Sequence, residues 1–317
     1  MGKNILVLIP VNEKHKRLLE EKAPSASFVY SSSKDVDEAQ VYNANIIMGT
    51  PQADLLKKAQ NLEWLQLSSA GVGEYGKKQN LPQGAILTNA SGAYGLAISE
   101  YMLGVLLELY KKLHLYRDRQ PEMEWSSLGQ VKSIYGSVAL IIGAGDIGGE
   151  FARKVKALGA YTIGIRRSNP NKPDYLDELH FMDELEQLLP RADIVSLSLP
   201  ATSLTDRIIN RDTLALMKQD AVLINVGRGS AIDTEALCDA LESGRLLGTA
   251  MDVTDPEPLP KGHRLWKMKN AIITPHVSGG YSLQETLERV VRICADNLEA
   301  YFNNKSLSHI VDLSAGY

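Results

Sequence analysis

Three side chains in the C-terminal half of the chain, those of Arg228, Glu257 and His276, form a complete set for moving a hydride to or from a carbonyl carbon. They lie in the consecutive blocks INVGRGS, DVTDPEP and TPHVSG. An arginine guanidinium binds a carboxylate with fixed geometry. A histidine transfers the proton, and a neighbouring carboxylate orients its ring and favours the charged imidazolium. These residue types therefore predict a catalytic site that reduces a keto acid or runs the reverse oxidation.

A glycine-rich loop, GAGDIG at residues 143–148, precedes these blocks. It follows an apolar strand expected over 138–142 and opens an expected helix, which is the context that a dinucleotide-binding loop requires. Gly143 permits a tight turn, Gly145 lets the backbone approach a pyrophosphate, and Gly148 allows the helix to pack closely on the strand. The negative pyrophosphate would meet the helix N-terminus. The motif predicts a site for a nicotinamide dinucleotide.

The strand after this loop indicates which dinucleotide is preferred. Sites that prefer NAD usually place an acidic residue about 20 residues beyond the loop, where it bonds the ribose 2′-hydroxyl. This strand instead ends with Arg166, Arg167 and Ser168 and offers no acid. Guanidinium groups and a hydroxyl would hold a 2′-phosphate that a carboxylate would repel. We therefore expect a preference for NADP(H) over NAD(H). The alternative is that both arginines are merely solvated and that either cofactor binds.

Short apolar strands alternate with amphipathic helices along the chain, a pattern typical of parallel sheets covered by helices on both faces. Five strands are expected in the N-terminal part, and the six expected in the C-terminal part match a complete dinucleotide-binding sheet. The sequence thus predicts an α/β fold with doubly wound parallel sheets. The expected strands lie at 4–10, 27–33, 43–49, 62–68, 84–90, 138–143, 161–165, 193–199, 221–226, 247–253 and 271–275. The expected helices lie at about 13–21, 53–58, 97–115, 146–158 and 283–302.

The candidate catalytic residues all follow expected strands. Arg228 comes directly after the strand at 221–226 and has a glycine on each side. Asp252 ends the next strand, and Glu257 follows it between two prolines that limit where its carboxylate can point. His276 follows the last strand. Open parallel sheets bind ligands at the carboxyl ends of their strands, so this joint placement favours one functional site over unrelated structural residues.

Composition narrows the class of protein. A chain of 317 residues predicts two domains, and 44% hydrophobic residues are enough to fill their cores. The net charge of -4 argues against nucleic acid as the main partner. The two cysteines, Cys238 and Cys294, are expected to be reduced core thiols. With no signal peptide, membrane span or metal site predicted, we expect a soluble cytoplasmic protein that acts on a small molecule.

These motifs and their order resemble the D-isomer-specific 2-hydroxyacid dehydrogenase family, which includes glyoxylate/hydroxypyruvate reductases and phosphoglycerate dehydrogenases, over most of the chain. The resemblance implies two domains, Rossmann-like or flavodoxin-like, with a cleft between them. A discontinuous substrate-binding domain would comprise 1–96 and 283–317, and an NAD(P)-binding domain would comprise 97–282. The helix at 97–115 would be the outgoing crossing between them. Together with its neighbours, this helix would form the interface of a homodimer.

The resemblance also implies a role for each motif. Arg228 would clamp the substrate, His276 would act as acid and base, and Glu257 would orient the histidine ring. The small residues at 68–73 would hold the substrate carboxylate through backbone N–H groups, and Asp252 would contact the nicotinamide carboxamide or ribose. The expected substrate-binding residues are Ala70, Gly71, Val72, Arg228 and His276. The expected cofactor-binding residues are Gly143, Gly145, Asp146, Ile147, Gly148, Arg166, Arg167, Ser168, Leu199, Pro200, Thr205, Val226, Gly227, Asp252 and Gly279.

The predicted function is that of an NAD(P)-dependent oxidoreductase that interconverts a 2-keto acid and, by resemblance, a D-2-hydroxy acid. Glyoxylate, hydroxypyruvate and larger 2-keto acids all stay open as substrates, and Tyr94 either shapes that choice or simply packs. Formate dehydrogenases of the same superfamily have a glutamine where this chain has Glu257, so formate oxidation is not expected. The alternative is a non-catalytic dinucleotide sensor of the corepressor type, which shares the fold and the Arg, Glu and His pattern. The compact length and the lack of a basic surface signature favour the enzyme.

Overall fold

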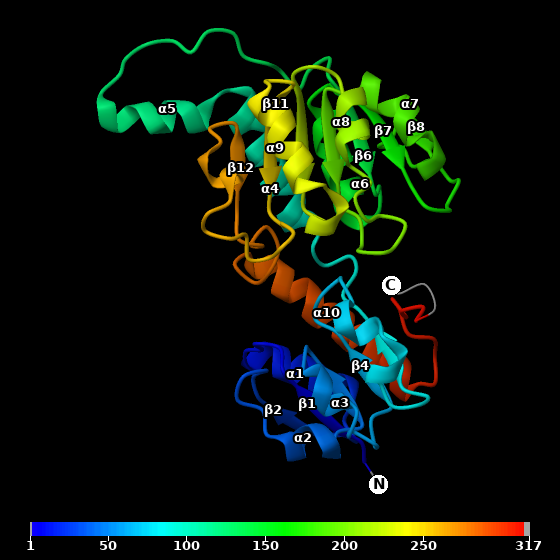
Figure 1. Ribbon diagram of the computed structural model, residues 1–317. Helices are drawn as coiled ribbons and strands as arrows, with labels where there is room; N and C mark the ends of the chain where they lie inside the picture. The colour runs from blue at the N-terminus through cyan, green and yellow to red at the C-terminus, as the bar shows by residue number, and fades with distance from the viewer. Residues whose placement is uncertain (1, 314–317) are drawn as a thin grey trace. The chain divides into compact units, whose positions relative to one another are not determined.

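The computed structural model describes residues 2–313, which fold into two compact units (Figure 1). Unit 1 comprises Met1–Tyr94 together with Gly280–Tyr317, and unit 2 comprises Gly95–Gly279. Each unit contains one sheet, and all strand pairs in both sheets are parallel. The predicted α/β class with two doubly wound parallel sheets is confirmed. Among the described residues, no helix combines the length and apolar character that a membrane span needs.

Unit 1 has a five-stranded sheet in the order β2-β1-β3-β4-β5, the flavodoxin-like order. The inner strands are buried on both faces, so neighbouring residues of β1 belong to different cores: Ile5 packs with residues of α1 and α10, and Leu6 with residues of α2 and α3. All five predicted strands are present, and α2 is a helix that the sequence did not predict. The strands are β1 (Asn4–Val7), β2 (Ser27–Tyr30), β3 (Ile46–Met48), β4 (Trp64–Gln66) and β5 (Ile86–Thr88). The helices are α1 (Glu13–Lys22), α2 (Glu38–Asn43), α3 (Ala53–Leu56) and α10 (Gln284–Phe302), with short 3₁₀ turns at Gly73–Gly76 and Lys78–Asn80.

A buried polar network joins α10 to the sheet of unit 1. The Asn297 side chain donates to Gln66 Oε1 at 2.8 Å and accepts from the Ser308 backbone N–H at 2.7 Å. Gln66 Oε1 also accepts from the hydroxyl of Thr88, which in turn accepts from the indole N–H of Trp64. Asn297 is 1% exposed and Gln66 is fully buried. The network therefore fixes both the returning helix and the segment after it against β4 and β5.

Replacing Asn297 with alanine is expected to lower the free energy of unfolding by about 2 kcal/mol, because buried groups of Gln66 and Ser308 lose their partner. Urea denaturation followed by circular dichroism measures this loss. Asn303→Ala, at the exposed end of the same helix, is the matched control and is expected to cost about 0.5 kcal/mol or less. Equal losses in the two variants would show that the network contributes nothing beyond an ordinary helix-end contact.

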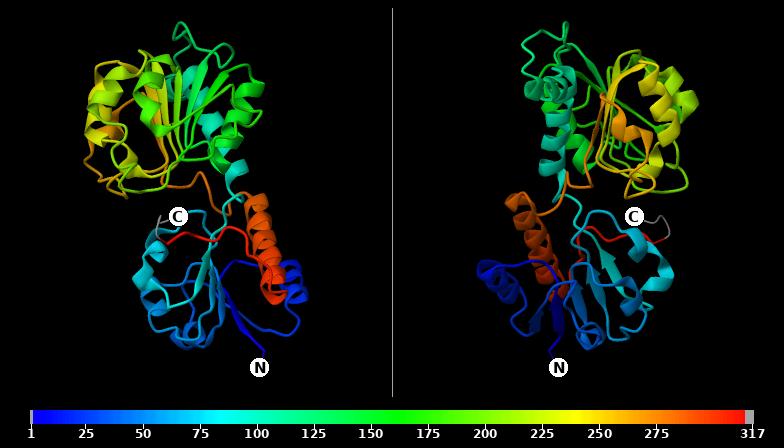
Figure 2. Two further views of the ribbon diagram at one scale, coloured as in Figure 1. Left: turned by 90° about the vertical axis from the view of Figure 1, so that its right-hand side faces the viewer. Right: turned by 60° about the vertical axis from the view of Figure 1, so that its left-hand side comes forward.

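Unit 2 has a seven-stranded sheet in the order β12-β11-β10-β9-β6-β7-β8, which is the Rossmann order with one further strand at β12. Figure 2 shows these strands between helices on both faces, with α4 and α6 (teal and green) on one side and α8 and α9 (yellow) on the other. The strands are β6 (Val138–Ile142), β7 (Tyr161–Ile165), β8 (Glu178–His180), β9 (Ile194–Leu197), β10 (Ala221–Asn225), β11 (Leu246–Met251) and β12 (Ala271–Ile273). The α-helices are α4 (Gly95–Tyr110), α5 (Leu113–Arg119), α6 (Asp146–Ala157), α7 (Leu185–Leu188), α8 (Arg211–Leu216) and α9 (Thr234–Glu242). The 3₁₀ turns lie at Gln120–Glu122, Met182–Glu184, Leu189–Arg191, Gly229–Ala231 and Arg264–Lys267.

Two predictions for unit 2 were wrong in detail. The sequence predicted six strands, and the edge strand β8 is a seventh, half-exposed strand that has charged residues instead of an apolar run. The single helix predicted over 97–115 is two helices, because Lys112 takes a left-handed conformation with φ 58° between α4 and α5. Figure 1 shows α5 extending away from the sheet of this unit, with the chain after it arching back.

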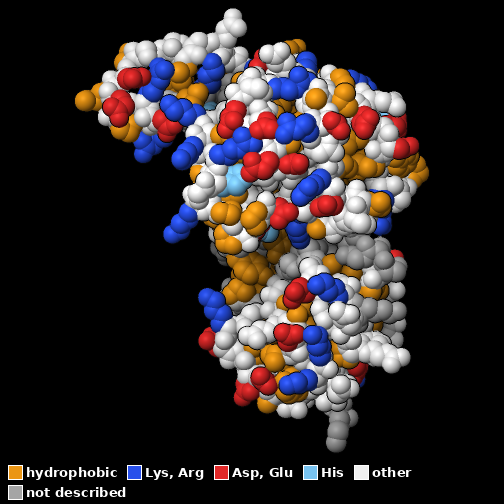
Figure 3. Space-filling model, in the orientation of Figure 1, with side chains coloured by type: hydrophobic (Ala, Val, Ile, Leu, Met, Phe, Trp, Pro, Cys, Tyr) orange, Lys and Arg blue, Asp and Glu red, His pale blue; other side chains and the backbone are white. Residues whose placement is uncertain are grey.

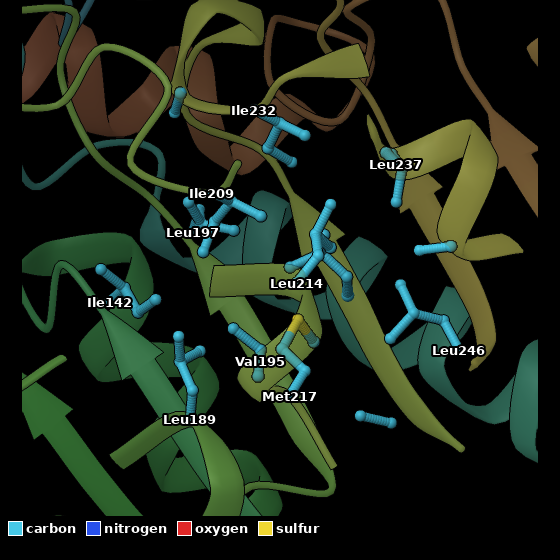
Figure 4. Close-up of a cluster of buried hydrophobic side chains, with 14 of the residues drawn as sticks. Ile142, Leu189, Val195, Leu197, Ile209, Leu214, Met217, Ile232, Leu237 and Leu246 are labelled. Atoms are coloured by element: carbon cyan, nitrogen blue, oxygen red, sulfur yellow. The ribbon is translucent and has the colours of Figure 1, made fainter. Parts of the chain in front are cut away.

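One core of unit 2 lies between the sheet and the layer formed by α8 and α9. Figure 4 shows Ile142 and Val195 of the sheet beside Leu214 and Met217 at α8. Leu237 of α9 closes the same cluster. Because these side chains are less than 5% exposed, the strands keep a fixed register behind the loops at their carboxyl ends.

Candidate active site

The predicted catalytic residues follow three neighbouring strands of unit 2. Arg228 comes after β10, Glu257 after β11 and His276 after β12, and these strands are adjacent in the sheet. Because the strands are parallel, their carboxyl ends lie at one edge. The structure therefore brings all three residues to the same edge of one sheet.

His276 and Glu257 form a direct pair. The Nδ1 atom of His276 lies 2.7 Å from Oε1 of Glu257, and both side chains are about half exposed, at 50% and 43%. A hydrogen bond at Nδ1 orients the ring and leaves Nε2 as the nitrogen that can meet a ligand. The pair can therefore exchange a proton with a ligand through Nε2 while the carboxylate holds the ring at Nδ1.

Asp252 holds the segment that carries His276. One of its carboxylate oxygens accepts from Thr274 Oγ1 at 2.6 Å and from the Val277 N–H at 2.9 Å, and the other accepts from the Ser278 N–H at 3.0 Å. Asp252 is 1% exposed. Tyr101 of α4 extends this network through Thr274 at 2.7 Å, and burial raises the pKa of Tyr101 to about 12. The structure thus shows Asp252 fixing the loop that carries His276, a role that the sequence did not predict.

The loop that carries Arg228 is organised by Asn225. The Asn225 side chain donates to the Arg228 carbonyl at 2.9 Å and accepts from the Gly227 N–H at 3.0 Å. Arg228 is half-buried and donates to the Gly227 carbonyl at 2.7 Å. A Cβ at Gly229 would lie 2.0 Å from the backbone of Thr254, in the loop that leads to Glu257. The missing side chain at Gly229 therefore lets the arginine loop and the glutamate loop approach each other.

The glycine loop has the geometry that a dinucleotide needs. Gly143 has φ +94°, and Gly148 packs so closely that a Cβ there would lie 2.3 Å from the Gly143 carbonyl oxygen. A Cβ at Gly145 would instead meet no atom within 4 Å, so the backbone is open to a ligand at the start of α6. These residues fit the pyrophosphate of a dinucleotide bound at the N-terminus of α6.

Other predicted cofactor residues surround this loop and are partly engaged within the protein. Gly227 lies against the Leu199 backbone, where a Cβ would be 2.6 Å from the Leu199 nitrogen, and Thr205 donates to the Pro200 carbonyl at 2.7 Å. The Asp146 carboxylate accepts from the Gly95 N–H at 3.0 Å, which connects α6 to the first turn of α4. Val226 is buried beside Gly227, Ile147 is in the first turn of α6, and Gly279 ends unit 2.

At the end of β7, Arg166 is half-buried, and Arg167 and Ser168 are exposed.

The predicted carboxylate-binding loop at 68–73 lies in unit 1, directly after β4. Three of its carbonyl oxygens accept hydrogen bonds from side chains: Asn89 donates to the Ala70 carbonyl at 2.9 Å, Ser69 to the Gly71 carbonyl at 2.7 Å, and the Tyr94 hydroxyl to the Ser68 carbonyl. Within residues 2–313, no backbone acceptor meets the N–H groups of 70–72. These three N–H groups, like those of Ser68, Ser69 and Gly73, are therefore available to bind an anion.

Sequence reasoning missed the residues that hold the catalytic ones. Asn225 hydrogen-bonds the loop of Arg228, and Thr274 and Ser278 hydrogen-bond Asp252, whereas the sequence shows them only as polar residues at or after a strand end. The available signal was their position, because short polar side chains that directly follow buried strands often satisfy nearby backbone groups.

Comparison with known proteins gives consistent matches. The model of the NAD-binding domain of D-isomer specific 2-hydroxyacid dehydrogenases matches residues 103–278. A glyoxylate reductase of Korarchaeum cryptofilum is 27% identical over 89% of this chain and 84% of its own length, and a hydroxypyruvate reductase of Thermotoga maritima is 29% identical over 75% and 77%. A solved structure from Aeromonas salmonicida, described as a D-isomer specific 2-hydroxyacid dehydrogenase family protein, covers 99% of this chain and 100% of its own, with 31% identity and a TM-score of 0.88.

Proposed function

Because the chain belongs to the D-isomer specific 2-hydroxyacid dehydrogenase family and is an NAD(P)-dependent oxidoreductase of that class, we propose that it reduces a small 2-keto acid with His276 as the proton donor. The observation that carries the proposal is the His276–Glu257 hydrogen bond at the carboxyl edge of a nucleotide-binding sheet. The relatives described above are named as reductases. They give no support to the alternative of a non-catalytic sensor.

The roles of the residues follow from their chemistry. The nicotinamide cofactor supplies the hydride when it is bound. Arg228 neutralises charge on the substrate, and the N–H groups of 70–72 bind the substrate carboxylate. His276 donates a proton from Nε2 to the oxygen of the substrate carbonyl as that oxygen gains charge, and Glu257 holds Nδ1 and stabilises the imidazolium. Asp252 keeps the histidine loop in place.

A panel of 2-keto acids tests this function and ranks substrates. Purified protein is mixed with NADPH or NADH and with glyoxylate, hydroxypyruvate, pyruvate, phenylpyruvate or 2-ketoisocaproate, and the loss of cofactor absorbance is followed. We expect turnover with at least one of these acids and a D-configured product, which chiral chromatography identifies. Tight cofactor binding without turnover of any acid would instead favour the sensor.

NADPH is the preferred cofactor in this proposal, because the end of β7 has two arginines and a serine and no acid. We expect Arg167→Asp to raise the KM for NADPH by about tenfold, because a carboxylate repels the 2′-phosphate, and to leave the KM for NADH within about twofold. Lys267→Asp, an equal change of charge at another exposed position of unit 2, is the control. Equal KM values for the two cofactors in the wild-type protein would contradict the preference.

A homodimer through α5 and the chain that follows it is also part of the proposal. Figure 3 shows hydrophobic side chains exposed at the α5 end of unit 2. The most exposed large apolar residues just after α5 are Trp125, fully exposed, and Met123, 89% exposed. Exposed apolar side chains of this size are typical of interfaces between copies. We expect a dimer by analytical ultracentrifugation and a shift to monomer in the double variant Met123→Ser with Trp125→Ser. Leu204→Ser, at an 81% exposed residue elsewhere in unit 2, is the control.

A further inference from the structure

Arg166 is held by the protein on several sides. Its Nε donates to the Ala144 carbonyl at 2.7 Å, one terminal nitrogen donates to the Tyr175 hydroxyl at 2.8 Å, and the other donates to the Asn171 carbonyl at 3.4 Å. The side chain is half-buried. The alternative in which both arginines are merely solvated is therefore wrong for Arg166.

Tyr175 is itself fixed on the surface of α6. The guanidinium carbon of Arg153 lies 4.1 Å from the centre of the Tyr175 ring, in a cation–π contact, and Arg153 is paired with Glu150 at 2.6 Å. The Tyr175 hydroxyl lies over Gly149, where a Cβ would be 2.8 Å away. A larger residue at position 149 would displace this ring. The hydroxyl that receives the Arg166 hydrogen bond therefore has a fixed place.

Arg166 connects the two parts of the nucleotide site. Ala144 lies in the glycine loop, where the fold places a pyrophosphate, and Arg166 follows β7, where the fold places the adenosine ribose. Of the five N–H groups of the guanidinium, three are engaged by the protein, which leaves two for a ligand. An arginine that is already ordered loses little side-chain freedom when it binds a phosphate.

We propose that Tyr175 is a positioning residue for recognition of the cofactor 2′-phosphate: its hydroxyl sets the plane of the Arg166 guanidinium, so that the remaining N–H groups meet the phosphate. This inference rests on the proposed preference for NADPH. Tyr175 lies in the loop between β7 and β8, beyond the end of β7 where the arginines stand. The inference therefore adds a loop residue to those that determine the cofactor preference.

Equilibrium binding of two nucleotides to the full chain tests the role without catalysis. The probes are adenosine 2′,5′-bisphosphate and 5′-AMP, which differ only in the 2′-phosphate, and calorimetry gives both dissociation constants. Wild-type protein is expected to bind the bisphosphate more tightly. Tyr175→Phe keeps the ring under Arg153 but removes the hydroxyl, and it is expected to weaken bisphosphate binding by about fivefold and leave 5′-AMP binding unchanged.

Tyr161→Phe is the matched control, because Tyr161 also loses a hydrogen-bonded hydroxyl but stands at the opposite end of β7. It is expected to change neither constant. If Tyr175→Phe proves poorly folded, Arg153→Met, which removes the cation above the ring, is measured in its place and is expected to lower bisphosphate binding selectively.

The outcomes separate the two proposals. A wild-type protein that binds both probes equally would overturn the NADPH preference and the role of Tyr175 with it. A wild-type preference for the bisphosphate that persists in Tyr175→Phe would overturn only the role of Tyr175. An equal loss for both probes would also overturn it, because Tyr175 would then support the whole site through Arg166 and the glycine loop.

Discussion

His276→Asn is expected to lower kcat for keto-acid reduction by about 10³-fold. In the His276–Glu257 pair the proton comes from Nε2 of the histidine, and asparagine has no group that can donate it. Asparagine is chosen because His276 has φ 53°, a left-handed conformation that asparagine tolerates better than alanine does. The backbone N–H of residue 276, which donates to the Asp252 carbonyl at 2.8 Å, is unchanged by the substitution. Steady-state kinetics measures kcat, and fluorescence titration is expected to show unchanged NADPH binding.

His263→Asn is the matched control for this variant. His263 caps the 3₁₀ turn Arg264–Lys267 by accepting from the Leu265 N–H, a bond that asparagine can also make. We expect the control to keep kcat within about twofold of the wild-type value. A His276→Asn protein with more than about a tenth of the wild-type kcat would show that another group supplies the proton.

Gly229→Ala is expected to destabilise the protein by about 3 kcal/mol and to lower kcat by about 10²-fold. The added Cβ would lie 2.0 Å from the carbonyl carbon and oxygen of Thr254 and 2.6 Å from the Asp255 nitrogen. These are backbone atoms, so they cannot rotate away, and the loops that carry Arg228 and Glu257 must separate. Thermal denaturation and steady-state kinetics measure the two effects.

Gly262→Ala is the control, since a Cβ at this exposed glycine would meet no atom within 4 Å. We expect it to change stability by less than about 0.5 kcal/mol and to leave kcat unchanged. If Gly229→Ala changes stability and kcat as little as this control does, the glycine does not set the spacing of the two loops. The close approach to Thr254 would then have no effect on activity.

The strands were predicted because burial on both faces requires a continuous apolar run, which the sequence shows directly. The same reasoning missed β8 and α2, whose residues are mostly half-exposed and polar. It also missed the break at Lys112, since nothing in an apolar helical pattern marks one left-handed residue. Local patterns thus predict the elements whose stability comes from burial, and they fail where contacts with the rest of the unit decide the conformation.

The candidate catalytic residues were predicted for a different reason: each is a distinctive residue type that follows the end of a strand. Their supports were not predicted, because Asn225 or Ser278 looks like any polar residue of a turn until the chain is folded. Asp252 was predicted to contact the cofactor, and its four hydrogen bonds to the His276 loop appear only in three dimensions. The sequence therefore predicts the candidate reactive groups, and the structure shows which hydrogen bonds hold their loops in place.

The return of α10 to unit 1 has a consequence for the order of folding during synthesis. All of unit 2, Gly95–Gly279, is translated before α10, and its sheet can form without that helix. One core of unit 1 includes Val290, Val291 and Leu298 from α10 and is incomplete until that helix emerges. The N-terminal strands therefore cannot complete this core, and Ile5 and Val7 stay exposed to solvent, until α10 has been translated more than two hundred residues later. A released fragment that ends before residue 284 is therefore expected to have a protease-resistant unit 2 and a protease-sensitive N-terminal region.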